Sequence, residues 1–223
     1  LAEAADCFKA AVESDPSYAG AWHDLGIVLY WLERWEEAAK AFDACLELVP
    51  EEKYVAYKIG LCSLQNGQVE QAVDAFGEAA ESGHLEARFQ LGLICVRQAP
   101  GRLQARQQAV AHFQAILTAV EEGEEYAGTD RVCFALGGLF SEDSESRHQA
   151  VQVYRRGLSI NPLSAVGHNS LGLLLMQSGQ VLGSLGEFKV AIQLDPTYHA
   201  PYTNLARLLF QHINPTELPQ EYE

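Results

Sequence analysis

The sequence predicts an all-α protein, an α-solenoid in which helical hairpins repeat along the chain. The first observation is a column of glycines, each inside an apolar segment such as "DLGIVL" that otherwise has a helical pattern. The second is a column of aromatic residues, with a small residue four positions before each of them. The third is the interval within both columns, which is close to 34 residues in most repeats and is typical of a solenoid.

The two columns also suggest why the glycines are there. The glycine column comprises Gly26, Gly60, Gly92, Gly137 and Gly172, with Ala206 in the sixth place. The aromatic column comprises Phe8, Phe42, Phe76, Phe113, Tyr154 and Phe188. A glycine in the middle of a helix costs about 1 kcal/mol relative to alanine, so its recurrence indicates a packing role. We expect small residues to let two helices approach while the aromatic ring fills the space toward the next hairpin.

The columns assign the elements in order along residues 1–212. Half of a repeat, a lone second helix, is expected over 1–16 and ends at Pro16. Complete hairpins are expected at 19–52, 53–84, 85–121, 130–163 and 165–198, because each range holds one member of the glycine column followed by one member of the aromatic column. A lone first helix is expected over 199–212. Residues 213–223, with prolines and acids, are expected to be a tail or a linker, and the half repeat at the start favours a fragment of a longer protein.

One repeat shows the complete pattern. The segment "AWHDLGIVLYWLERWEEAAKAFDACLELVP" carries Trp22, Leu25, Gly26, Ala38, Phe42 and Pro50 in the order W-x2-L-G, A-x3-F, P. This pattern resembles the tetratricopeptide repeat, and the resemblance extends from Leu1 to about Gln211. It implies a right-handed superhelix in which the first helix of each hairpin lines a concave groove. In that family the groove holds extended or helical peptides.

The third repeat is longer than the others. Five additional residues separate Gly92 from Phe113, and we expect them to enlarge the turn near 98–108. Six more separate Phe113 from Gly137, near 119–130, where either a longer second helix or a loop accounts for them. The "SEDSESR" segment is expected to be a solvated turn, with a phosphoacceptor loop as the alternative.

Composition restricts the kinds of partner. The chain has 30 acidic and 15 basic residues, a formal net charge of −15. Nucleic acids and anionic lipids bind clustered Lys and Arg, so neither partner is expected. A protein or peptide segment that is basic or apolar fits this balance better. No apolar run approaches the eighteen residues of a membrane span, so no membrane insertion is expected.

No catalytic or metal-binding motif is present in the sequence. The five cysteines lie in apolar helical segments without a CxxC pair, which favours buried free thiols in a reducing compartment, hence a cytoplasmic location. The seven histidines form no HExxH, and neither a phosphate-binding GxxxxGK nor a GxSxG occurs. We therefore expect no enzyme activity in this chain, no cofactor and no metal.

The resemblance also implies a set of ligand-binding residues, which lie on the first helices beside the glycine column. They are His23, Ile27, Tyr30, Trp31, Tyr54, Tyr57, Lys58, Leu61, Phe89, Leu93, Arg97, Arg131, Phe134, Asn169 and Asn204. Aromatic residues, which are typical binding anchors, dominate the N-terminal half of this set. For Phe89 and Phe134 the alternative is packing beneath neighbouring helices.

The function predicted from these features is a non-catalytic interaction scaffold that binds a peptide or protein segment in the groove. One alternative is a regulatory or substrate-selecting domain of a larger enzyme, such as a kinase or a glycosyltransferase. Another is self-association through the terminal helices, because Phe8 and its neighbours lack one adjacent hairpin.

Overall fold

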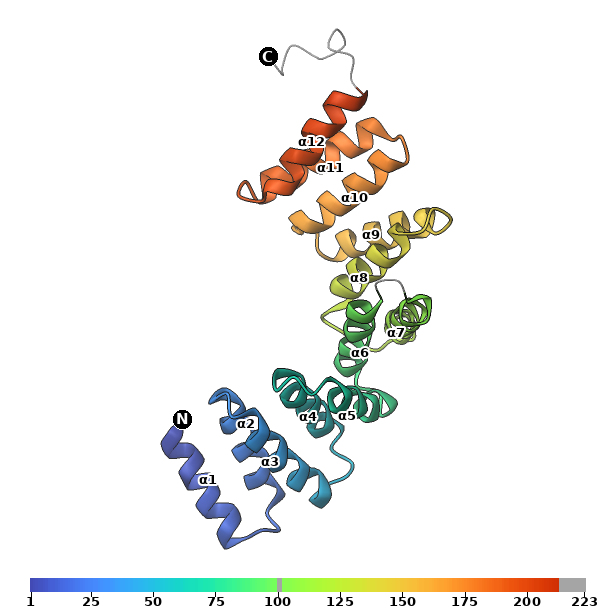
Figure 1. Ribbon diagram of the computed structural model, residues 1–223. Helices are drawn as coiled ribbons and strands as arrows, with labels where there is room; N and C mark the ends of the chain where they lie inside the picture. Colours follow the sequence, from blue (N-terminus) through green and yellow to red (C-terminus); the bar gives the residue numbers. More distant parts are fainter. Residues whose placement is uncertain (100–101, 213–223) are drawn as a thin grey trace. The chain divides into compact units, whose positions relative to one another are not determined.

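The computed structural model describes residues 1–99 and 102–212, which form twelve α-helices and no strand (Figure 1). The prediction of an all-α chain is therefore confirmed for these residues. They divide into two compact units, Leu1–His112 and Phe113–Glu223, each of which is described by itself. The expected tail, 213–223, lies outside the described residues.

Most helices alternate between the first and second members of a hairpin. The first unit holds α1 (Ala2–Ser14), α2 (Ala19–Trp31), α3 (Trp35–Leu48), α4 (Lys53–Gln65), α5 (Val69–Glu81) and α6 (Leu85–Gln98). The boundary between the units falls within α7 (Leu103–Glu121). The second unit continues with α8 (Thr129–Ser141), α9 (Arg147–Ile160), α10 (Ala165–Gln177), α11 (Val181–Leu194) and α12 (His199–His212).

In three of the hairpins the turn between the two helices contains one residue in the left-handed region. Gly67 between α4 and α5 has φ +78°, and Gly179 between α10 and α11 has φ +73°. Between α2 and α3 the corresponding residue is Glu33, with φ +59°, a conformation that is rare for a residue with a side chain. This turn allows the chain to reverse within three residues, so that the two helices pack side by side.

The core explains the two columns seen in the sequence. In four hairpins a Cβ atom added to the glycine would lie within 3 Å of the aromatic ring of the same hairpin. The pairs are Gly26 with Phe42 at 2.7 Å, Gly60 with Phe76 at 2.5 Å, Gly137 with Tyr154 at 2.9 Å, and Gly172 with Phe188 at 2.7 Å. Phe42 also shares a core cluster with Val55 of the next hairpin. The glycine thus makes room for a ring that joins neighbouring hairpins.

The insert near 98–108 differs from our expectation of an enlarged turn. Helix α6 ends at Gln98 and α7 already begins at Leu103, so most of the additional residues extend the start of the second helix. Ala109, the small residue of the column, is six positions after the start of α7, whereas Ala38 is three positions after the start of α3. Near 119–130 both alternatives apply, because α7 continues to Glu121 and a loop over 122–128 follows.

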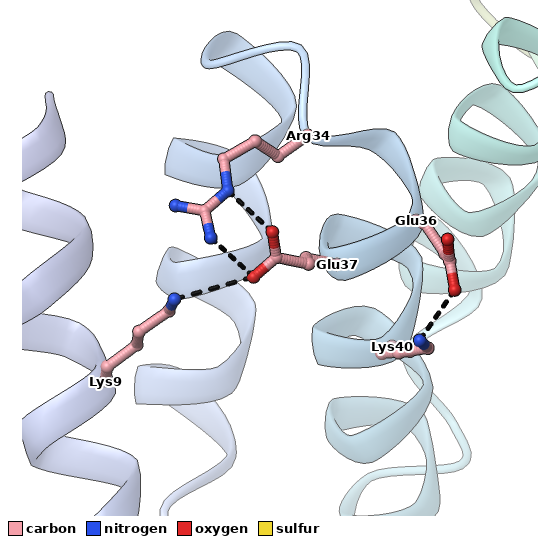
Figure 2. A network of polar contacts seen from close by, with 5 residues as sticks. All are labelled: Lys9, Arg34, Glu36, Glu37 and Lys40. Atoms are coloured by element: carbon pink, nitrogen blue, oxygen red, sulfur yellow. Dashed lines mark hydrogen bonds and ion pairs between the residues drawn. The ribbon is translucent and has the colours of Figure 1, made fainter.

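A polar network connects α1 with α3 and the turn that precedes α3 (Figure 2). Glu37 on α3 accepts two hydrogen bonds from the Arg34 guanidinium, at 2.6 and 2.7 Å, and a third contact of 3.5 Å from Lys9 on α1. The hydrogen bonds from Arg34 lower the pKa of Glu37. Apolar contacts accompany the network, because Ala5 and Val12 of α1 are buried in the same core cluster as Leu25. Helix α1 is therefore packed against α2.

The cysteines depart from the expectation in one case. Cys45, Cys62 and Cys133 are buried and Cys95 is half-buried, but Cys7 on α1 is exposed. Apolar residues around Cys7 suggested burial, yet its side chain is exposed on α1. Burial raises the pKa of Cys62 to about 12 and that of Cys133 to about 11, which suppresses the reactive thiolate.

Selective alkylation tests this distribution of thiols. In the native protein at pH 8 we expect iodoacetamide to modify Cys7 on the order of ten times faster than Cys62 or Cys133. Cys7 is exposed, whereas Cys62 and Cys133 are buried and burial raises their pKa. Peptide mapping by mass spectrometry after timed quenching measures the rates. Cys7→Ser should abolish the fast phase, and labelling of native Cys62 at the rate of Cys7 would contradict the prediction.

Candidate functional site

A cluster of aromatic side chains lies on the first helices of the first unit. Tyr30 and Trp31 come from the end of α2, and Tyr54, Tyr57 and Lys58 come from the first two turns of α4. On α4 the spacings of three and four residues place these side chains on one helical face. His84, immediately before α6, and Trp35, at the start of α3, complete the set, which we call the aromatic surface.

Lys58 connects the two helices of the aromatic surface. Its ammonium nitrogen lies 4.8 Å from the centroid of the Tyr54 ring and 5.7 Å from that of Tyr30. Both distances are within the range of cation–π attraction. Tyr30 belongs to α2 and Tyr54 to α4, so one cation holds together residues of successive hairpins.

The rings pack in two groups on either side of Lys58. On α2, the Tyr30 ring stands nearly perpendicular to Trp31, at 86° and 6.1 Å between centroids, and contacts Trp35 at 4.9 Å. On α4, Tyr54 and Tyr57 are 6.1 Å apart. His84 stacks on Tyr57 at 4.5 Å with 23° between the ring planes. These contacts fix the ring orientations before any ligand arrives, which lowers the entropy cost of binding.

His84 has a defined protonation state. Its Nδ1 atom accepts a hydrogen bond of 3.1 Å from the backbone N–H of Ala87 and thereby caps α6. An acceptor nitrogen carries no proton, so the neutral ring has its hydrogen on Nε2. Burial lowers the pKa of His84, and the nearby Lys58 acts in the same direction. A neutral donor at Nε2 is therefore the resting state of this residue.

The parts of the aromatic surface differ in exposure. Trp31 is 67% exposed and Tyr54 is 46% exposed, both large values for aromatic side chains. Tyr30, Tyr57 and Lys58 are half-buried. Beside Tyr54 a hollow of about 420 Å³ opens between α2, α3 and α4, lined by Ala19, Gly20, His23, Cys45, Val49, Glu52 and Tyr54. The exposed Tyr54 ring thus borders a depression large enough for a side chain of a ligand.

Other predicted residues of the first unit surround this cluster. His23, Ile27, Leu61 and Leu93 are half-buried, and Arg97 is exposed. His23 approaches Phe42 edge-on and contacts Asp24 at 3.2 Å. The structure does not support Phe89 as a contact residue, because its side chain is only 5% exposed and is part of the core. Packing beneath neighbouring helices, the alternative given above, describes Phe89.

The predicted residues of the second unit are mostly engaged within it. Phe134 packs against Gly157 and Gly167 and stacks near Tyr154, so its ring is not available as a binding anchor. Asn169 and Asn204 are only 4% and 8% exposed, and the Asn204 amide donates to Asn169 at 2.9 Å. Asn169 donates in turn to the Tyr198 hydroxyl. Arg131 alone is exposed, beside the Tyr126 hydroxyl.

Sequence reasoning missed two members of the aromatic surface. His84 lies in the turn before α6, and Trp35 lies at the start of a second helix, whereas the expected residues were all on first helices. The sequence signal for His84 was its position directly after Gly83, because a glycine that ends one helix places the following residue at the start of the next. Its neutral capping role depends on geometry, because histidine is not among the favoured capping residues.

Residues 1–99 and 102–212 contain no cluster of His, Cys, Asp or Glu suited to hold a metal ion. Within the same ranges, no helix is both long enough and apolar enough to cross a bilayer.

A pH titration of stability tests the assignment of His84. Because the pKa of His84 is lowered on folding, the unfolded chain binds more protons than the native chain below the ordinary histidine pKa of about 6.5. The stability contributed by neutral His84 is therefore complete above that pH and decreases as the pH falls toward the lowered value.

We expect His84→Asn to reduce this loss, since asparagine also caps a helix but does not titrate. Urea midpoints at pH 7.5 and 5.5 provide the measurement. His112, whose pKa is lowered by burial and by Arg88, remains in the variant and accounts for part of the residual dependence. An identical change of midpoint in wild type and variant would contradict the role of His84.

Comparison with known proteins supports the repeat assignment. Residues 1–53 and 23–86 match a family model described as tetratricopeptide repeat. The YrrB crystal structure, titled a TPR protein with an unusual peptide-binding site, aligns with a TM-score of 0.67 at 18% identity over 89% of this chain and 97% of that one. The chain has the tetratricopeptide-repeat fold. Yeast Tom70 has the same fold, with a TM-score of 0.66 at 14% identity over 92% of this chain and 42% of Tom70.

Two relatives illustrate the similarity in sequence. The peroxisomal targeting signal receptor of Kluyveromyces lactis is 24% identical over 206 residues, 92% of this chain and 35% of that protein. A TPR repeat-containing protein of Methanocaldococcus jannaschii is 21% identical over 210 residues, 90% of this chain and 36% of that protein. The chain thus spans about a third of the length of these relatives.

Proposed function

We propose that this tetratricopeptide-repeat chain is a non-catalytic interaction module that binds a protein or peptide segment on the aromatic surface. The observation that carries the proposal is the exposure of Trp31 and Tyr54 beside a cation held between two hairpins. Exposed aromatic residues of this kind are typical anchors of interfaces. The similarity to a peroxisomal targeting signal receptor and to YrrB, a TPR protein described as having a peptide-binding site, supports the same class of function.

Further features of the proposal concern the partner and the compartment. An apolar or basic segment fits a chain with a net charge of −15, because long-range attraction steers a cationic partner toward it. No nucleic-acid ligand is proposed. Five free cysteines support a reducing, cytoplasmic environment. The alternative for the whole protein is a regulatory or substrate-selecting role beside an enzyme domain. In that case the aromatic surface would also be the binding surface.

The test uses a double variant of the aromatic surface. Crosslinking and mass spectrometry identify the protein captured by the wild-type chain, and isothermal titration then measures its affinity. We expect Trp31→Ala combined with Tyr57→Ala to weaken binding at least tenfold, which corresponds to about 1.4 kcal/mol. The Trp31 and Tyr57 rings bury a large area on binding with little loss of rotamer freedom, and substitution by alanine removes this contact area.

The matched control is Leu182→Ala on α11, a second helix, where an exposed apolar side chain is removed without touching the aromatic surface. The control should bind the partner like wild type, and circular dichroism should show equal helicity for all variants. Unchanged affinity in the double variant would reject the site.

Self-association through the end of the chain is a second candidate function. On α12 the Phe210 side chain is 93% exposed, an unusual position for phenylalanine. Light scattering of the wild-type chain and of Phe210→Ser across a concentration series distinguishes this candidate. A dimer that dissociates in the variant supports it, and a monomer at all concentrations rejects it.

A further inference from the structure

The aromatic surface offers many hydrogen-bond donors. Trp31 provides an indole N–H and Lys58 an ammonium group, and neither side chain can accept a hydrogen bond. His84 adds the Nε2–H that follows from its capping bond to Ala87. Among the described residues, no hydrogen bond or ion pair engages the Trp31 indole nitrogen or the Lys58 ammonium, whose contacts are with rings. The Trp31 and Lys58 donors are therefore available to acceptors of a ligand.

The rings around these donors are fixed and face in different directions. Trp31 and Tyr30 meet nearly at a right angle, whereas His84 lies flat on Tyr57. The exposed Trp31 and Tyr54 rings provide apolar surface beside the indole N–H and the Lys58 ammonium. A complementary ligand would place compact apolar side chains on these rings and hydrogen-bond acceptors between them.

We infer that the aromatic surface binds a proline-rich segment in the polyproline II conformation. This inference rests on the proposed function and specifies the chemistry of its ligand. A polyproline II segment has no internal hydrogen bonds, so its carbonyl oxygens are available, and each proline lacks an N–H donor. The carbonyl oxygens carry partial negative charge, which complements the Lys58 ammonium and the Trp31 indole N–H. Proline rings pack on aromatic side chains in known grooves of this kind.

Other classes of peptide complement this surface less well. A helical ligand uses its carbonyl groups internally and leaves the donors of the aromatic surface unpaired. A strand added to a sheet edge is not an option in the described residues, which contain no strand. A lysine-rich segment would bring further donors beside Lys58, although the net charge attracts it at long range. The contacts therefore favour proline over basic residues at this site.

The experiment compares four fluorescein-labelled peptides of twelve residues by anisotropy with the full chain. They are a proline-rich peptide of repeated Pro-Pro-Ala, a Gly-Ser peptide, an amphipathic helical peptide and a Lys-Ala peptide. We expect the proline-rich peptide to bind at least about tenfold tighter than the Gly-Ser peptide, because it loses less conformational entropy and provides rings. In heteronuclear NMR spectra the Trp31 indole N–H signal should shift on its addition.

Two conservative variants test the donors separately. Trp31→Phe retains a ring without the N–H, and Lys58→Met retains the alkyl stem without the charge. Each should weaken the proline-rich peptide about fivefold, the equivalent of one net hydrogen bond of about 1 kcal/mol. Leu182→Ala should have no effect.

Tighter binding of the helical or the lysine-rich peptide at the same residues would overturn the inference and leave the proposed function intact. If no peptide shifts the Trp31 signal, the inference also fails. The captured partner then tests the proposed function. If Trp31→Ala combined with Tyr57→Ala weakens its binding, the proposed function stands; if the affinity is unchanged, the proposed function is rejected as well.

Discussion

Replacing Phe42 by alanine is expected to lower the free energy of unfolding of the first unit by about 3–5 kcal/mol. The Phe42 side chain is completely buried, with 0% exposure, and it lies against Gly26 of the same hairpin. It also belongs to the core cluster that includes Val55 of the next hairpin. Removing the ring therefore leaves a cavity between two hairpins as well as within one, and a glycine beside it cannot fill the space.

Urea unfolding followed by circular dichroism measures this effect, with the Trp fluorescence of the first unit as a second probe. A repeat protein can lose cooperativity between repeats, so both probes are needed. Phe210→Ala on α12 is the matched control, because the same atoms are removed from a side chain that is 93% exposed. A Phe42→Ala midpoint equal to that of wild type would show that the assigned register is wrong.

The fold could be predicted because its determinants repeat in the sequence. A glycine in one column and an aromatic residue in the other meet in four separate hairpins, so any single repeat was supported by the others. The boundaries of the inserts were less predictable. Additional residues between Gly92 and Phe113 can lengthen either a turn or a helix, and in α7 the helix was extended from Leu103.

The candidate site was only partly predictable. Positions such as Trp31 and Tyr54 followed from their place on first helices, and the structure leaves them exposed. Burial of Phe89 and of the Asn169–Asn204 pair could not be read from spacing, since it depends on how closely successive helices pack. Asparagine at these positions suggested polar contacts with a ligand. The structure instead satisfies the two amides internally, in keeping with the rule that buried polar groups are paired.

Alanine substitutions at two glycines are expected to change stability in opposite directions. Both Gly26 in α2 and Gly77 in α5 lie inside helices, where alanine is intrinsically favoured by about 1 kcal/mol. A Cβ at Gly77 would meet nothing within 4 Å, so Gly77→Ala should stabilise the chain by about 0.5–1 kcal/mol. At Gly26 the Cβ would lie 2.7 Å from Cε1 of Phe42, closer than packed atoms tolerate.

Gly26→Ala is therefore expected to destabilise the first unit by about 2 kcal/mol, and the larger Gly26→Leu by more, because the buried ring has no space to move. The interaction between the two positions can be isolated by a double-mutant cycle with Phe42→Leu, a smaller side chain. If the clash is the cause, Gly26→Ala should cost less in the Phe42→Leu background than in wild type, a non-additive result. Equal costs in both backgrounds, or a stabilising Gly26→Ala like that of Gly77, would show that the glycine column does not exist to admit the aromatic ring.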